Sequence, residues 1–160
     1  ASLFQKGKKI YNIALYEAPI FGNIKMLNHI YEFNKNSNLI FSLHNYTLSN
    51  AALSGNIECL VYAHKVIGAK DSHHFTLESA ALSGNIECLV YAHKVIGAKD
   101  INCYTLSNAA LSGNIKCLVY THKVIGAKDS RNLTLKNAIK SENIECITYC
   151  NDNFIDLLVW

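Results

Sequence analysis

A segment of 25 residues occurs three times in this chain at a spacing of 29 residues. It reads TLSNAALSGNIECLVYAHKVIGAKD from Thr47 to Asp71 and returns, with two changes each time, at Thr76 and Thr105. A degenerate copy starts at Thr134, and a shorter trace of the pattern precedes the first full copy. Units of this length cannot bury an apolar face alone, so they stack on one another, and the end units differ because each has one face in water. We therefore expect one domain over 1–160 with five units: an N-terminal capping repeat 1–46, internal repeats 47–75, 76–104 and 105–133, and a C-terminal capping repeat 134–160.

Each unit reads as two helices separated by a tight turn. The first helix starts at a Thr, which suits a helix N-terminus, and has an apolar edge of Leu and Ala. Gly55-Asn56 breaks the helices apart, and Gly68 follows the second helix where a left-handed residue is expected. No segment alternates with period two, so strands should be absent or confined to loop tips. The predicted fold class is an all-α, helix-turn-helix repeat solenoid.

The second helix has an apolar stripe and a mixed stripe. The apolar stripe is formed by Ile57, Leu60, Ala63 and Ile67, with Cys59 and Val66 beside it. The opposite stripe carries Glu58, Val61 and Lys65. This periodicity is typical of an amphipathic helix that packs on one side.

Composition limits the class of protein further. The chain has 160 residues, of which 50% are hydrophobic, and this is enough to bury a core. Its net charge of +3 is too small to predict nucleic-acid binding. No apolar stretch approaches the roughly 18 residues of a membrane-spanning helix, so we expect no membrane insertion. The basic start, Lys6 to Lys9, is interrupted by polar residues and is read as folded protein rather than as a signal peptide.

The motif Thr-Leu-x-x-Ala-Ala-x-x-Gly-Asn-Ile-Glu-Cys-Leu, from Thr76 to Leu89 and followed by Gly97-Ala98, resembles the ankyrin repeat. Glu-Cys-Leu-x-Tyr-Ala-His, from Glu87 to His93, is similar to the divergent ankyrin repeats of giant viruses of amoebae and of some protists. The resemblance covers residues 14 to 154. It implies a host-cytoplasmic or virion setting and host–virus interaction. One departure is that Phe75-Thr76-Leu77-Glu78 replaces the family's Thr-Pro-Leu-His, so the hydrogen-bonding brace of that His is missing.

Cysteine and histidine each recur at the repeat spacing. Stacked helices lie about 8 to 10 Å apart, too far for a disulfide or for thiolates that share a metal, so we expect buried free thiols at Cys59, Cys88, Cys117 and Cys146. Cys103, in a loop, is the one thiol expected to be exposed. The histidines His64, His93 and His122 are expected to be half-buried against the next repeat. The loop pair His73-His74 has no Cys or carboxylate at ligand spacing and predicts no metal site.

Catalysis is not indicated by any motif. The chain has no nucleophile elbow, no phosphate-binding glycine loop and no zinc-helix motif. We therefore expect a protein that is not an enzyme and uses no cofactor.

The copies differ from one another almost only in helix-one pairs and loop triplets. In proteins similar to ankyrin these segments line the concave face, so we expect a protein partner to be bound there, although drift at solvated positions explains the differences as well. The candidate partner-binding residues are Ser49, Asn50, His73, His74, Glu78, Ser79, Asn102, Ser107, Asn108, Arg131 and Asn132. The aromatic residues that end the loops, Tyr46, Phe75 and Tyr104, are expected to anchor them to the core.

Two apolar rows are difficult to place in the core. Val61, Val90 and Val119 share the stripe expected to face water, and Leu53, Leu82 and Leu111 precede the turns. Exposed contiguous apolar surface indicates contact with another molecule. The alternative function is therefore a structural subunit that self-associates or assembles through these rows; a slight rotation of the helices would instead bury them.

Overall fold

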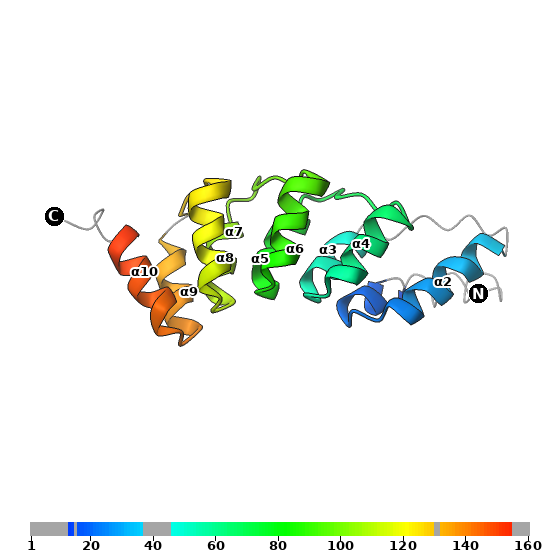
Figure 1. The fold of residues 1–160 in the computed structure, drawn as a ribbon, viewed down its shortest axis with the longest axis horizontal. Coiled ribbons are helices and arrows are strands. Elements are labelled where there is room, and N and C mark those ends of the chain that lie inside the picture. The colour runs from blue at the N-terminus through cyan, green and yellow to red at the C-terminus, as the bar shows by residue number, and fades with distance from the viewer. Residues whose placement is uncertain (1–12, 15, 37–45, 130–131, 155–160) are drawn as a thin grey trace, which may run out of the picture.

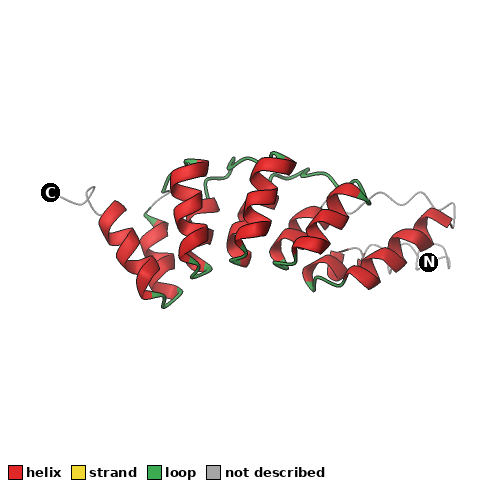
Figure 2. Ribbon diagram, viewed as in Figure 1, coloured by secondary structure: helices red, strands yellow, loops and turns green. Residues whose placement is uncertain are grey.

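The computed structural model describes residues 13–14, 16–36, 46–129 and 132–154. Every regular element in these ranges is a helix and none is a strand (Figure 2), so the all-α fold class is confirmed. The elements are α2 (Ile24–Asn36), α3 (Thr47–Leu53), α4 (Ile57–Lys65), α5 (Thr76–Ser83), α6 (Ile86–Tyr91), η1 (Ala92–Ile96), α7 (Thr105–Leu111), α8 (Ile115–Tyr120), η2 (Thr121–Ile125), α9 (Leu133–Lys140) and α10 (Ile144–Phe154).

The helices form one elongated row of pairs (Figure 1). In one layer α3 packs against α5, α5 against α7, and α7 against α9. The second helices α2, α4, α6, α8 and α10 contact one another in the same order in a second layer. Loops joining successive pairs follow one edge of the row, and the tight turns within pairs follow the other (Figure 2).

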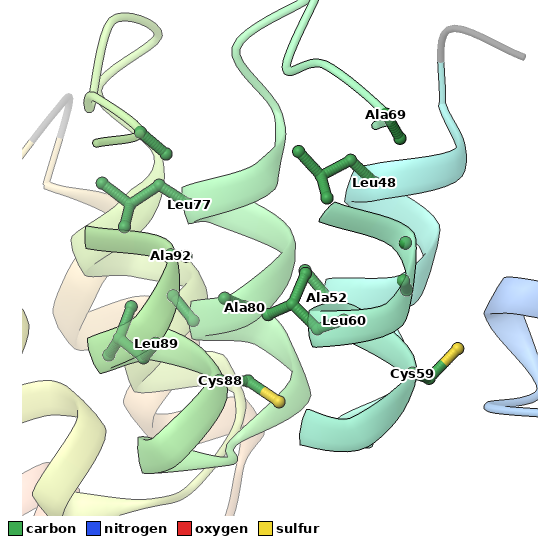
Figure 3. Close-up of a cluster of buried hydrophobic side chains, with 14 of the residues drawn as sticks. Leu48, Ala52, Cys59, Leu60, Ala69, Leu77, Ala80, Cys88, Leu89 and Ala92 are labelled. Carbon is green, nitrogen blue, oxygen red and sulfur yellow. The ribbon is translucent and has the colours of Figure 1, made fainter. Parts of the chain in front are cut away.

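The core consists of small and medium apolar side chains between the two layers. Leu48, Leu60, Leu77 and Leu89 have no more than 1% exposure and belong to one buried cluster that continues from one helix pair to the next (Figure 3). The alanines on α3, α5 and α7 are fully buried, which lets neighbouring first helices approach closely. Each buried leucine contributes about 1.5 to 3 kcal/mol by the hydrophobic effect.

The Gly-Asn turn has a defined role in every full copy. Gly84 adopts φ +69°, a left-handed conformation that favours glycine. The Asn85 carboxamide oxygen then caps α6 by accepting from the backbone N–H of Glu87 at 2.8 Å and of Cys88 at 3.1 Å. Its Nδ2 donates to the carbonyl of Gly55 in the preceding turn at 2.9 Å. One side chain therefore ends the turn, starts the helix and joins two repeats.

An aspartate supplies the brace at the start of the first helix. Asp71 Oδ1 accepts from the Thr76 hydroxyl at 2.8 Å and from the Thr76 backbone N–H at 3.2 Å. Asp100 and Thr105 repeat this pair, as do Asp129 and Thr134. No His stands in Phe75-Thr76-Leu77-Glu78, and a carboxylate five residues before the Thr forms the hydrogen bonds at the start of this helix instead.

The end of the second helix departs from ideal α-geometry. The backbone N–H of Ile67 donates to the Tyr62 carbonyl at 3.1 Å, a spacing of five residues, and η1 and η2 are π-helical segments at the same place. The wider turn admits one extra residue. As a result Ile67 reaches the core while Val66 turns outward and is 48% exposed, so the expectation that Val66 joins the apolar stripe is wrong.

Candidate binding surface

Four of the predicted partner-binding residues are buried rather than exposed. Ser49, Asn50, Glu78 and Ser107 lie on the first helices with 2% to 9% exposure. Each first helix is short and lies between the first helices of two neighbours and its own partner helix, which leaves these positions little contact with water. The expectation that they present a free surface is therefore wrong.

Their polar groups serve the fold. Asn50 Nδ2 donates to the Tyr16 carbonyl of the preceding unit at 3.1 Å, and the Ser107 hydroxyl donates to the Tyr104 carbonyl at 3.0 Å. Ser49 makes the equivalent bond to Tyr46 at 3.1 Å. Buried polar groups with partners stabilise one arrangement of the stack.

The remaining candidates are more accessible. His73, His74 and Asn132 are exposed, whereas Asn102, Ser79 and Asn108 are half-buried. Arg131 lies outside the described residues. The accessible part of the predicted surface is thus in the loops rather than on the helices.

Exposed aromatic rings directly precede the first helices α3, α5 and α7, and a further one lies within the helical residues 16–20. Tyr16, Tyr46, Phe75 and Tyr104 are each 36% to 38% exposed. The Tyr46 ring stacks on His73 with centroids 4.9 Å apart and on Phe75 at 6.2 Å, while Tyr16 meets Tyr46 edge-on at 6.3 Å. The expected role as loop anchors is thus only part of what these rings do. The signal in the sequence was an aromatic residue directly before the helix-one Thr in three copies.

Glu78 is the one carboxylate that the copies place on a buried face of helix one. It is 9% exposed, and its Oε1 has no hydrogen-bond partner in the described part of the chain. Burial raises the pKa of Glu78, the carboxylates of Asp100 and Asp71 act in the same direction, and the Asn102 amide opposes them. The other two full copies have Ser49 and Ser107 at this position, so one of the three full copies buries a carboxylate there.

The cysteine prediction is confirmed for every described thiol. Cys59, Cys88, Cys117 and Cys146 are buried and free, and Cys103 is exposed. Burial raises the pKa of the Cys59, Cys88 and Cys117 thiols to about 11. Neutral buried thiols pack as small apolar groups and are poor nucleophiles and metal ligands.

The repeated histidines pack against the next repeat, as predicted. Nδ1 of His64 lies 3.0 Å from the Tyr91 hydroxyl, and the pairs His93–Tyr120 and His122–Tyr149 follow at 3.0 and 2.8 Å. Burial raises the pKa of Tyr91 and Tyr120, so these hydroxyls keep their protons. The ladder joins neighbouring second helices by hydrogen bonds.

The apolar rows are only partly where the sequence placed them. Val61, Val90 and Val119 are half-buried, as are Leu53, Leu82 and Leu111. Each row is therefore partly covered, between the exposed and the buried arrangement considered above. The exposed row consists instead of Val66, Val95 and Val124, at 48%, 52% and 52%.

In the part of the chain that the structure describes, no three His, Cys, Asp or Glu side chains come together as metal ligands. In the same residues every helix is too short or too polar to cross a lipid bilayer.

Comparison with known proteins gives no match: neither a protein-family model nor a curated protein sequence is similar to this chain.

Proposed function

We propose that the chain is a module of five stacked ankyrin-like units that binds a protein partner and performs no catalysis. The 29-residue repeat and the ordered packing of α3, α5, α7 and α9 support the stacking. A stack in which each unit contacts only its neighbours offers a long continuous surface to a partner. The resemblance of the repeats to viral and protist ankyrin repeats supports a setting in the cytoplasm of a host cell or in a virion.

The observation that carries the proposal is the exposed aromatic cluster of Tyr16, Tyr46, His73, Phe75 and Tyr104. Aromatic side chains are enriched in protein interfaces because they bury a large area at a small cost in conformational entropy. The rings of Tyr16, Tyr46, His73 and Phe75 contact one another across successive units, so they form one surface rather than separate residues. Tyr104 holds the position of Phe75 in the next unit. This surface includes His73 from the predicted site, and exposed His74 lies beside it in the sequence.

Affinity capture from amoebal lysate tests the proposal. The variant Phe75→Ser with Tyr104→Ser removes two rings of the cluster. The matched control, Phe33→Ser with Ile139→Ser, removes two exposed apolar side chains elsewhere. We expect one protein to be recovered by the wild type and by the control and lost with the cluster variant, while thermal melts show all three folded. Recovery of the same proteins by every variant would exclude the cluster as the binding site.

The alternative, a structural subunit, is supported by the exposed valines Val66, Val95 and Val124, which lie at the same position of three successive units. In that case the purified chain should assemble, and light scattering should show a mass well above 17.8 kDa. Val66→Ser, Val95→Ser and Val124→Ser together should return it to a monomer. A wild-type chain that is monomeric at high concentration would remove this alternative.

A further inference from the structure

Charge is segregated along the second helices. Glu58 and Glu87 lie in the first turns of α4 and α6, beside the Gly-Asn turns. Lys65 lies seven residues after Glu58, which is about 10 Å along a helix axis. The lysines at the other end of these helices and in the loops that follow are all exposed: Lys65, Lys70, Lys94, Lys99, Lys123 and Lys128. We call this set the lysine edge; it follows the edge of the row where the inter-repeat loops run (Figure 1).

The lysines of this edge outnumber the carboxylates beside them. No lysine of the set forms an ion pair with a carboxylate among the described residues. The aspartates that follow Lys70, Lys99 and Lys128 in sequence are half-buried, and one oxygen of each, as in Asp100, accepts two hydrogen bonds from a Thr of the next helix. Six exposed lysines against three half-buried carboxylates leave the edge with an excess of positive charge, which attracts an anionic partner.

Apolar surface alternates with these cations. Val95 and Val124, each 52% exposed, directly follow Lys94 and Lys123. Between the third and fourth units the edge also contains a hollow of about 530 Å³. Lys99 and Lys128 line it together with Asp100 and with apolar groups that include Ala98, Ile125 and Ala127. A ligand seated here would meet two lysines, one half-buried carboxylate and an apolar floor at once.

We propose that the lysine edge binds an extended acidic peptide segment of a partner protein in which apolar residues separate the carboxylates. Stacked helices repeat about every 8 to 10 Å, and one turn of an extended polyproline II chain has three residues and spans about 9 Å, so that every third side chain lies on the same face. A carboxylate at every third residue of the peptide would thus lie next to the lysines of successive units. An apolar side chain between two carboxylates would enter the hollow beside Lys99 and Lys128. Nucleic acid fits less well, because its phosphates offer no apolar group to the valines.

The inference does not rest on the proposed function, because it uses none of the residues of the aromatic cluster. Its probe is a fluorescein-labelled peptide of four Glu-Leu-Ser units, and binding is measured by fluorescence anisotropy at about 50 mM salt. The edge variant carries Lys99→Gln, Lys123→Gln and Lys128→Gln. The charge-matched control carries Lys25→Gln, Lys116→Gln and Lys140→Gln, which are exposed lysines outside the edge.

We expect the edge variant to raise the Kd about tenfold, since three exposed ion pairs are lost, and the control to change it less than about twofold. Substituting Ser for Leu in the peptide should also weaken binding. The Phe75→Ser, Tyr104→Ser variant should bind the peptide like the wild type, so failure of the proposed function leaves this result unaffected. Equal weakening by the two lysine variants, no effect of the Leu substitution, or tighter binding of a 12-nucleotide thymidine strand than of the peptide would each overturn the proposal.

Discussion

Asn85→Ser separates the two roles of the asparagine in the Gly-Asn turn. Serine caps a helix about as well as asparagine, so the bonds from the backbone of α6 should survive. The substitution removes the Nδ2 donor, however, and leaves the Gly55 carbonyl without its 2.9 Å hydrogen bond. A part-buried hydrogen bond contributes about 0.5 to 1.5 kcal/mol. We expect Asn85→Ser to lower the free energy of unfolding by about 1 kcal/mol, and Asn85→Ala, which also loses the cap, by about 2 kcal/mol.

The chain contains a matched control. Asn143 caps α10 by accepting from the Cys146 backbone N–H at 3.0 Å, but its amide donates to no carbonyl in the described residues. Asn143→Ser should therefore leave stability unchanged within about 0.3 kcal/mol. Urea unfolding followed by circular dichroism at 222 nm measures all three variants. If Asn85→Ser proved as neutral as Asn143→Ser, the bond between repeats would contribute nothing and our account of the turn would fail.

Four further predictions follow from single positions. Thr121, where two other copies have Ala, has a buried hydroxyl without a partner in the described chain, so Thr121→Ala should raise stability by about 1 kcal/mol in urea unfolding. Glu142 adopts φ +57° where the full copies have Gly, so Glu142→Gly should raise stability by about 1 kcal/mol in the same assay; a loss would contradict the strain. Burial raises the pKa of Glu78, so the Glu78 carboxyl stays protonated to a higher pH in the folded protein than in the unfolded chain. The free energy of unfolding therefore falls as the pH rises from the unfolded to the folded pKa of Glu78. Glu78→Gln should accordingly raise the free energy of unfolding more at pH 8 than at pH 4. A thiol reagent should modify Cys103 rapidly in the folded protein and the buried thiols only in denaturant; a second fast thiol would contradict the packing.

The all-α fold could be predicted from the sequence because the same pattern of apolar and turn residues occurs in each repeat. The buried leucines, the cysteine ladder and the half-buried histidines all follow from helical spacing and the repeat period. Val66 could not be placed correctly, because its orientation depends on a π-turn that adds one residue to the last turn of the helix. Nothing in the apolar pattern distinguishes this turn from an α-helical one.

The candidate site was less predictable because divergence and polarity do not measure exposure. Ser49, Asn50 and Ser107 are polar and vary in the array, which favours a solvated surface. The structure buries them because first helices pack closely on one another and backbone carbonyls of the same or neighbouring unit accept their hydrogen bonds. Sequence alone does not reveal which carbonyls lie within reach of a given side chain.

The repeats also explain why the lysines of this chain lie along one edge of the row of helices. A net charge of +3 spread at random would produce a weak field. Because each full copy places its lysines at the end of the second helix and in the loop that follows, stacking aligns them along one edge. At the opposite end the copies carry Glu58, Glu87 and, by a single change, Lys116. The repeats thus place equivalent lysines in a row. A ligand that binds along this row should carry its anionic groups at the spacing of the units.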